Sequence, residues 1–543
     1  MGNLDVNNVS VVYRAGKIGI KDASFKAKEG EIIGFIGADG TGKSSLMHAI
    51  AGVIKFEGEI SFNQYTYHSP KEAEKVKKYI GFMPQGLGLI LYDTLTVEEH
   101  LDFFANIHNI TQDKKFKVYR DKLLHMAGLS KFTQREAGHL SGGMRQKLSL
   151  ICTLIHKPKL LLLDEPTTGV DPLSRLELWD ILDSIRKEEG TVIVVSTAYM
   201  QEASKMERLL LFDDNRIIAV GSSNELVESV RDNTYEKTPC EDDDCLELHN
   251  VTYSLKPLKA KHKEPTLEAI FFVNALKSKK KLPKISVSKR EKTLNIPDIV
   301  MEAKGLTKRF GDFVANDKID MELKRNEILG LFGANGAGKT TFIKMLLGLY
   351  PIDEGELKLL SHPIRSGKDR QKLKSQIGYV SQHFALYKNM SVRENLLYFA
   401  NIHQIPTSEA LKRISRYAEE LGFADYLDAM PKDLPLGINQ RFSIAAAIIH
   451  EPVVLFLDEP TSGVDVIARY QFWQLLKLLK KEWGISILIT THYMSEAEYC
   501  DRVVLLKSGK KIADDTVENF YKKHPNAHNF EEIFLEYYRE GQN

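Results

Sequence analysis

The sequence predicts an α/β protein in which one domain is present twice. Matching segments lie 294 to 296 residues apart along the 543-residue chain, and spacing this constant indicates a duplicated domain. Short apolar runs that pass directly into glycine-rich or acidic turns are typical of buried parallel strands in α/β folds. The matching pairs are GFIGADGTGKSSL from Gly34 and GLFGANGAGKTTF from Gly330, FFANIH ending at His108 and YFANIH ending at His403, and LLLLDEPTTGVD ending at Asp171 and VLFLDEPTSGVD ending at Asp465.

The composition is that of an ordinary globular protein, with 43% apolar and 27% charged residues. Lys and Arg number 74 against 73 Asp and Glu, and the net charge of +1 gives no general attraction to nucleic acid or to an anionic membrane. Four cysteines are too few for a disulfide scaffold. No apolar run approaches the roughly eighteen residues of a spanning helix, and the N-terminus resembles neither a signal peptide nor a myristoylation site. We expect a cytosolic protein that contacts a membrane only from outside.

Each copy contains a P-loop between an apolar strand and a helix. Residues 32–36 and 328–332 form the strands, and residues 37–44 and 333–340 form the loops. Glycines let several backbone N–H groups converge on phosphate oxygens, and the helix N-terminus adds its positive end. Lys43 and Lys339 are expected to reach the β- and γ-phosphates, and the hydroxyls of Ser44 and Thr340 to ligate Mg²⁺. The predicted phosphate-binding residues are Gly37, Asp39, Gly40, Gly42, Lys43, Ser44 and Ser45, and Gly333, Asn335, Gly336, Gly338, Lys339, Thr340 and Thr341.

A second apolar strand in each copy ends in an Asp-Glu pair. Residues 160–163 precede Asp164 and Glu165, and residues 453–457 precede Asp458 and Glu459. The aspartate is placed to hold magnesium, directly or through water. The glutamate, at the strand end beside the γ-phosphate, can orient and deprotonate a water molecule. These residues predict nucleotide hydrolysis with Mg²⁺ as the cofactor.

Further motifs resemble those of the ATP-binding cassette (ABC) ATPases. The segment LSGGMRQ, at residues 140–146, is similar to the family's signature motif, and Gln85 and Gln382 resemble its Q-loop glutamine. Residues 169–171 and 463–465 are similar to the D-loop, and His492 resembles the switch histidine. Tyr13 and Phe310 stand where the family stacks an aromatic ring on adenine. The resemblance covers nearly the whole chain.

The resemblance implies two RecA-like cores, each with a helical subdomain and an antiparallel β-subdomain. It implies an intramolecular sandwich of the two cassettes, in which each ATP lies between the P-loop of one copy and the signature of the other. Ser141, Gly142 and Gly143 would contact a γ-phosphate, because they open a helix and offer a hydroxyl and N–H groups. Glu459, His492 and Glu165 would be catalytic, with Gln85 and Gln382 both assisting catalysis and ligating Mg²⁺ beside Ser44, Thr340, Asp164 and Asp458.

The two composite sites are predicted to be unequal. In the second signature, Pro435 replaces the serine and Leu436 the first glycine, so that a hydroxyl and an N–H group are lost and a side chain is added. In the first copy, Ala198 stands where the second has His492. The resemblance implies that Pro435, Leu436 and Ala198 all belong to the composite site of the first P-loop. The site of the second P-loop is therefore expected to hydrolyse ATP, and the other mainly to hold it.

The predicted domains are a first cassette at residues 1–276, a basic linker at 277–297 and a second cassette at 298–543. Residues 277–292 carry eight Lys or Arg against one Glu. The linker is interpreted either as a solvated tether or as an arm that contacts anionic lipid or RNA phosphates. An acidic insert at about residues 235–264 contains the run 241–244, interpreted as a solvated loop. Cys240 and Cys245 flank this run, and no second Cys or His pair stands at metal-ligand spacing.

Residues 492–504 and the acidic-hydrophobic segment 531–535 resemble those of exporter ATPases for drugs, lipids or polysaccharides. The single-chain layout is similar to bacterial double-cassette ATPases of multidrug-type exporters. That resemblance implies two hydrophobic permease subunits as partners, a peripheral location on the cytoplasmic face of the inner membrane, and no specific nucleic acid. The alternative is a soluble double-cassette translation factor acting on the ribosome. The basic linker favours that alternative, whereas the defective second signature and the absence of a long charged hairpin argue against it.

Overall fold

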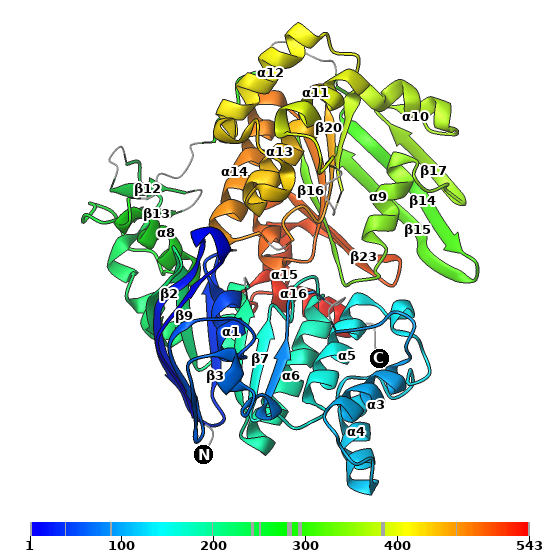
Figure 1. Ribbon diagram of the computed structural model, residues 1–543. Coiled ribbons are helices and arrows are strands. Elements are labelled where there is room, and N and C mark those ends of the chain that lie inside the picture. Colours follow the sequence, from blue (N-terminus) through cyan, green and yellow to red (C-terminus); the bar gives the residue numbers. More distant parts are fainter. Residues whose placement is uncertain are drawn as a thin grey trace. The chain divides into compact units, whose positions relative to one another are not determined.

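The computed structural model describes residues 3–38, 40–86, 90–197, 199–240, 244–248, 251–279, 285–290, 296–381, 386–462 and 464–540. The chain divides into two compact units whose main boundary falls between Leu282 and Pro283 (Figure 1). This boundary lies inside the predicted linker. In the described part of the chain, no helix is both long enough and apolar enough to cross a membrane.

The first unit is built on a mostly parallel sheet in the order β10-β9-β3-β8-β7-β6, in which only β10 runs antiparallel to its neighbour. Every residue of β3, β7 and β8 is buried, as expected for strands covered on both faces. The strands are β3 (Ile32–Gly37), β6 (Ile80–Met83), β7 (Leu160–Asp164), β8 (Val192–Thr197), β9 (Arg208–Asp213) and β10 (Arg216–Gly221). The strands predicted at residues 32–36 and 160–163 are therefore confirmed.

An antiparallel sheet in the order β2-β1-β4-β5 accompanies this core, and α3, α4 and α5 form the helical subdomain. Thr96 begins α3 with a capping box, in which its hydroxyl accepts from the Glu99 N–H and the Glu99 carboxylate accepts from the Thr96 N–H. The elements are β1 (Leu4–Val12), β2 (Ile18–Ala27), β4 (Glu57–Phe62), β5 (Tyr65–Tyr67), α1 (Lys43–Ile50), α2 (Pro70–Ala73), α3 (Val97–Ile107), α4 (Lys114–Met126), α5 (Gly142–Leu154), α6 (Pro172–Glu189), α7 (Ser223–Glu228) and α8 (Leu267–Lys277).

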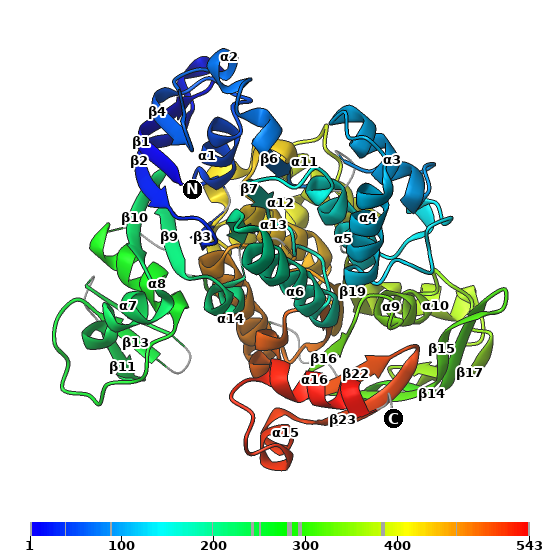
Figure 2. The ribbon, with the colours of Figure 1, turned by 90° about the horizontal axis from the view of Figure 1, so that it is seen from below.

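The second unit repeats the plan, with a core sheet in the order β19-β20-β21-β16-β22-β23 and an antiparallel sheet in the order β15-β14-β17-β18 (Figures 1 and 2). Ser391 and Glu394 repeat the capping box at the start of α11. The strands are β14 (Ile299–Phe310), β15 (Phe313–Lys324), β16 (Ile328–Gly333), β17 (Glu354–Leu359), β18 (His362–Pro363), β19 (Ile377–Val380), β20 (Val454–Asp458), β21 (Ser486–Thr491), β22 (Arg502–Lys507) and β23 (Lys510–Thr516). The helices are α9 (Lys339–Leu347), α10 (Gly367–Leu373), α11 (Val392–Ile402), α12 (Thr407–Glu420), α13 (Leu436–Ile448), α14 (Val466–Trp483), α15 (Val517–Lys523) and α16 (Phe530–Glu540).

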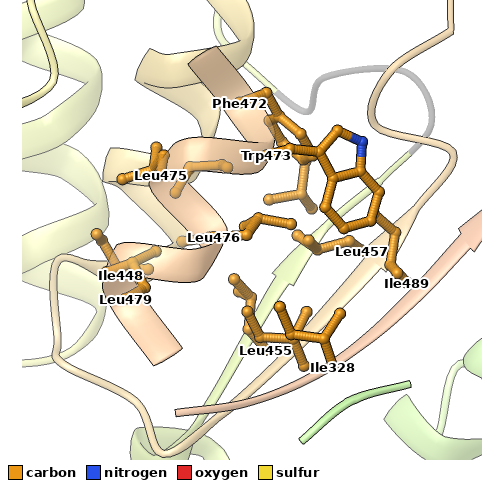
Figure 3. Packing of buried hydrophobic residues seen from close by; sticks show 14 of the residues in the cluster. Ile328, Ile448, Leu455, Leu457, Phe472, Trp473, Leu475, Leu476, Leu479 and Ile489 are labelled. Carbon is orange, nitrogen blue, oxygen red and sulfur yellow. The ribbon is translucent and has the colours of Figure 1, made fainter. Parts of the chain in front are cut away.

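Trp473, the largest side chain in the described part of the second unit that is fully buried, anchors α14 on the core sheet. It packs beside Phe472 and Leu476 of the same helix against residues of the parallel strands, including Leu457 and Ile489 (Figure 3). Burial of side chains this large contributes about 3 kcal/mol each, so this helix is held by packing rather than by propensity. This packing covers one face of the core sheet, and the ends of that sheet's strands hold the residues of the nucleotide site.

The acidic insert contains a small folded sheet rather than only a loop. Strands β11 (Thr234–Glu236), β12 (Cys245–Glu247) and β13 (Val251–Ser254) pair in the order β11-β13-β12, and the ring of Tyr253 stacks on Phe272 of α8. Every residue of β13 is buried, the polar Thr252 and Ser254 as well as the apolar Val251 and Tyr253. A disulfide joins Cys240 to Cys245. Of the acidic run, residues 241–243 lie outside the described residues, and Asp244 pairs with Lys256.

Part of the basic linker packs on the second unit, which the interpretation as a solvated tether did not anticipate. Ile285 is 3% exposed and belongs to the apolar core of that unit. The indole N–H of Trp483 donates to the carbonyl of Ser288, and Arg290 donates to the carbonyls of Glu451 and Pro452. Residues 280–284 and 291–295 lie outside the described residues, so this correction applies to residues 285–290.

Candidate nucleotide sites

Both P-loops have the backbone that phosphate binding requires. Gly42 and Gly338 stand at the N-cap of α1 and α9 with φ of 103° and 97°, a left-handed conformation that favours glycine. A Cβ atom at Gly42 would lie 2.3 Å from the carbonyl oxygen of Gly19, and one at Gly338 would lie 2.5 Å from that of Ala315. Only glycine therefore fits at these positions. The helices begin at the next residue, so that their N–H groups face the loop.

The P-loop lysines are held in place by the loops themselves. Nζ of Lys43 donates to the carbonyls of Gly37 and Ala38, both at 2.8 Å. Nζ of Lys339 donates to Gly333 at 2.8 Å and to Ala334 at 3.2 Å. Each lysine is only 4% exposed. A buried cation whose position is fixed in this way can meet phosphate oxygens without a large rearrangement.

In the second unit, Asp458 is joined to the P-loop helix. Its Oδ1 accepts from the Thr340 hydroxyl at 3.1 Å and from the Thr490 hydroxyl at 2.7 Å. Burial raises the pKa of Asp458, and the two hydroxyl hydrogen bonds oppose that effect. A carboxylate and a hydroxyl at this separation offer the hard oxygen ligands that Mg²⁺ prefers. In the first unit, Asp164 accepts from Ser196 at 2.5 Å.

Glu459 lies between two basic groups. Its carboxylate is 3.2 Å from Nδ1 of His492 and 3.6 Å from Nζ of Lys339. Burial acts to raise the pKa of Glu459, but the hydrogen bond and charge of His492, together with Lys339, lower it to about 2. The carboxylate is therefore ionised at neutral pH. The geometry brings together Lys339, Glu459 and His492, as the sequence predicted.

Glu165 has a different set of partners. Its carboxylate accepts from Nε2 of Gln85 at 3.0 Å and from the Thr168 hydroxyl at 2.9 Å. These two hydrogen-bond donors are neutral, whereas His492 and Lys339 are bases. The two glutamates thus have the same chain position but differ in these contacts.

Both glutamates adopt a left-handed backbone, with φ of 52° at Glu165 and 47° at Glu459. This conformation costs a non-glycine residue about 1–2 kcal/mol. Two bonds hold it in place: the Glu459 N–H donates to the Thr490 hydroxyl, and the Glu165 N–H donates to Ser196. Ser196 and Thr490 were missed by the sequence analysis. The repeated segments STAYM and TTHYM, which begin with them, could have indicated their shared role.

The two signature segments begin their helices differently. The Ser141 hydroxyl accepts from the Met144 N–H at 3.3 Å and caps α5, which starts at Gly142. At the matching position, Pro435 precedes α13, which starts at Leu436. Proline has neither a hydroxyl nor an N–H group to offer. The helix is retained in both units, but the hydroxyl and the N–H group of its N-cap residue are present only in the first.

The remaining predicted residues lie where the motif places them. Tyr13 and Phe310 are 40% and 45% exposed at the ends of β1 and β14, and the Tyr13 hydroxyl lies 3.0 Å from that of Ser45. Gly37 and Gly333 end β3 and β16, and the loops that follow hold Gly40, Asn335 and Gly336. The first turns of α1 and α9 hold Ser44, Ser45, Thr340 and Thr341, and α5 begins with Gly142 and Gly143. Asp39, Ala198 and Gln382 lie outside the described residues.

Comparison with known proteins places these sites in a family. The family model described as ABC transporter matches residues 20–168 and 316–462. The probable multidrug ABC transporter ATP-binding protein YbhF of Escherichia coli (strain K12) is 35% identical over 527 residues, which cover 90% of this chain and 89% of that protein. A putative ABC transporter ATP-binding protein of Bacillus cereus is 28% identical, covering 92% of this chain and 88% of that protein.

Solved structures share the fold at lower identity. The archaeal ribosome recycling factor aABCE1, solved with the ribosomal stalk protein aP1, matches with a TM-score of 0.62 and 19% identity, covering 95% of this chain and 92% of that chain. A structure named RNase-L Inhibitor matches with a TM-score of 0.62 and 20% identity, covering 95% of this chain and 93% of that one. The family model and the E. coli relative establish the family as well as the fold, because their matches cover both cassettes, including the P-loop and Asp-Glu motifs. The chain is therefore an ATPase of the ABC transporter family.

Proposed function

We propose that this chain is the ATP-hydrolysing motor subunit of a multidrug-type exporter, with both cassettes in one polypeptide and separate permease subunits in the membrane. The observation that carries this proposal is the similarity to the E. coli multidrug-type protein over 90% of the chain. The likeness to the ribosome recycling factor rests on 19% identity and supports the shared fold alone. The proposed location is the cytoplasmic face of the inner membrane, where the chain is bound through its permeases.

A pocket in the second unit supports a permease partner. It has a volume of about 680 Å³ and lies between α11 of the helical subdomain and β19 of the core sheet. Phe399, Ile402 and Leu386 give it an apolar wall, and Arg370 and Lys374 add positive charge at its edge. A short amphipathic helix from a permease has the chemistry to fill such a pocket. Gln382 would then relay the state of the γ-phosphate to that helix, and Gln85 would do the same for a permease helix at the first cassette.

We propose that hydrolysis takes place at the site of the second P-loop. Glu459 would deprotonate the attacking water, Lys339 would bind the β- and γ-phosphates, and His492 would hold the γ-phosphate and orient Glu459. The residues that would hold Mg²⁺ are Thr340 and Asp458, with Gln382. Bound there, the metal would neutralise charge on the phosphates. Ser141, Gly142 and Gly143 would complete this site across the proposed cassette sandwich.

The site of the first P-loop would hold ATP with slower turnover. Lys43, Ser44, Asp164 and Glu165 are all present, so binding is retained. The Ala198 side chain cannot donate to the γ-phosphate, Pro435 lacks the hydroxyl and N–H group of the opposing signature, and Leu436 adds a side chain there. In this scheme ATP at the first site stabilises the closed state, and hydrolysis at the second reopens it.

Co-purification of the full chain in mild detergent tests the exporter proposal. Membranes carrying the tagged chain are solubilised, and the bound chains are identified by mass spectrometry. Recovery of hydrophobic multi-span proteins in stoichiometric amounts is expected. Recovery of ribosomal proteins instead, with the native chain sedimenting with ribosomes and not with membranes, would overturn the proposal.

A further inference from the structure

In the described part of the chain, each cassette contains a pair of histidines whose rings are stacked face to face. The ring centroids of His108 and His156 lie 3.8 Å apart, and those of His403 and His450 lie 3.6 Å apart, with 3° between the planes in both pairs. His108 and His403 end the FANIH segments that mark the duplication. The same stack at matched positions of both copies indicates a constraint beyond incidental packing. The proposed ATPase mechanism does not use these four side chains.

Each pair joins three elements of its cassette. His403 follows α11 of the helical subdomain as its C-cap, and His450 lies in the turn between α13 and β20. Nε2 of His450 is 3.1 Å from the carbonyl oxygen of Ile377, the first residue of β19. In the first unit, His156 lies between α5 and β7, and its Nε2 is 3.2 Å from the carbonyl of Ile80, which begins β6. One imidazole thus contacts the core sheet through a hydrogen bond and the helical subdomain through its face.

The hydrogen bond to a carbonyl places the proton of His450 on Nε2, because a carbonyl oxygen can only accept. Burial lowers the pKa of His450 to about 3, and the nearby cations Arg413 and Arg290 act in the same direction. The pKa of His403 is also lowered by burial and by Lys374. Both rings are therefore neutral near pH 7, and two neutral rings can stack without charge repulsion.

The stack borders a pocket and is not enclosed in an apolar core. His403 and His450 both line the pocket between α11 and β19, together with Tyr379 of β19. In the described structure, Nδ1 of His450 is buried without a hydrogen-bond partner, and burying a polar atom in this way costs free energy. A pair of aliphatic side chains would fill the same volume without that cost. A planar ring that donates from its edge and stacks through its face meets both contacts at once, which an aliphatic side chain cannot do.

We propose that His403 and His450 are positioning residues of the ATPase, which set the orientation of the helical subdomain against the core sheet during turnover. His108 and His156 do the same in the first cassette. The P-loop and Asp458 belong to the core, and the hydrogen bonds of Lys339 and Asp458 are made to core residues and not to α11. Loss of the stack therefore leaves ATP binding intact and slows the step in which the helical subdomain must be correctly placed.

Substitutions at His403 in the full-length chain separate stacking from volume. His403→Phe keeps a flat ring, His403→Leu keeps apolar volume without one, and His403→Ala removes both. The kcat and KM of steady-state ATPase and the affinity for ATP are measured for each, with thermal unfolding as a check on folding. We expect His403→Phe to stay within about twofold of the unmodified chain, and His403→Leu and His403→Ala to lose about tenfold in kcat with KM nearly unchanged.

His450→Gln supplies an independent arm, because the amide N–H can replace the donor at Nε2 but cannot stack. His450→Gln is expected to lower kcat about as much as His403→Leu does. The double variant His403→Leu/His450→Gln is expected to be no slower than either single variant, because each single substitution already removes the same stacking contact. Full activity of His403→Leu would show that volume alone is needed and would overturn the proposal. Equal losses for His403→Phe and His403→Leu would overturn it as well. If His403→Ala fails to fold, the Phe and Leu variants still decide the question.

Discussion

Nδ1 of His492 lies 3.2 Å from the carboxylate of Glu459, whereas the equivalent Glu165 accepts from the neutral amide of Gln85 at 3.0 Å. Both contacts favour an ionised carboxylate, but only the imidazole can also take up a proton and carry a positive charge. The sequence shows one source of this difference, because Ala198 stands in the first cassette where His492 stands in the second. Together with Pro435 and Leu436, this difference motivates the proposal that the two ATP sites have different roles.

Ser141→Ala is expected to lower steady-state ATPase by about tenfold or more. The substitution removes the cap of α5, which costs about 1 kcal/mol, and also the hydroxyl proposed to contact the γ-phosphate. Initial-rate ATPase at saturating ATP measures the effect. Pro435→Ala is the matched control, because Pro435 has no polar side-chain group to lose, and it should change the rate by less than about twofold. Similar losses from both substitutions would contradict the assignment of Ser141 to the hydrolysing site.

Gly338→Ala should remove ATP binding at the second P-loop and leave the first intact. The added Cβ would lie 2.5 Å from the carbonyl oxygen of Ala315, at a φ of 97° that alanine rarely adopts. Equilibrium binding of ATP is expected to fall from two sites per chain to one. Gly367→Ala is the control, because a Cβ at Gly367 meets nothing within 4 Å. Two intact sites in Gly338→Ala would show that the loop can rearrange at low cost.

Arg290→Ala should loosen the packed part of the linker. It removes donors to the Glu451 and Pro452 carbonyls and the cation above the Trp483 ring, a loss of about 1–2 kcal/mol. The emission of Trp483, one of three tryptophans in the chain, is expected to shift to the red together with a lower urea midpoint. Lys289→Ala removes the same charge from an exposed neighbour and should change neither. Equal effects of the two substitutions would indicate that charge alone matters.

The buried histidines predict a loss of stability in acid. Burial lowers the pKa of His450 to about 3 and that of His156 to about 4, below the usual 6.5. As the pH falls below 6.5, the unfolded chain takes up protons at these imidazoles while the folded chain does not, so the free energy of unfolding decreases. The maximum slope is about 1.4 kcal/mol per pH unit for each imidazole.

Urea midpoints of the unmodified chain and His450→Gln, measured between about pH 5 and pH 7, test this acid effect. The variant should depend less steeply on pH, because one of the two histidines is absent. Parallel pH curves would show that His450 is not buried in its neutral form.

The duplicated α/β plan and the P-loop strands could be predicted from the sequence because they depend on local patterns. Residues 32–36 and 160–163 read as buried strands because every side chain is apolar, and the structure places β3 and β7 there. The family assignment was likewise confirmed. The roles proposed for Glu165, Glu459 and the other site residues stay predictions.

Features that depend on contacts between distant residues could not be predicted. Ser196 and Thr490 support the strained glutamates from a neighbouring strand, 31 residues further along the chain. The high charge of the linker gave no indication that Ile285 would be buried. The sheet of the acidic insert depends on Tyr253, which packs against a helix that comes later in the chain. In each case the contacting residue is determined by tertiary packing, which cannot be predicted from composition or motif spacing.

Steady-state ATPase of Glu459→Gln and Glu165→Gln tests the proposed inequality of the two sites most directly. Both substitutions remove a carboxylate from the same chain position and keep its size, so that each is the control for the other. Loss of the general base should lower the rate of Glu459→Gln by about 10²-fold or more, whereas Glu165→Gln should keep much of the activity. Equal losses from the two substitutions would contradict a division of the chain into one hydrolysing and one holding site.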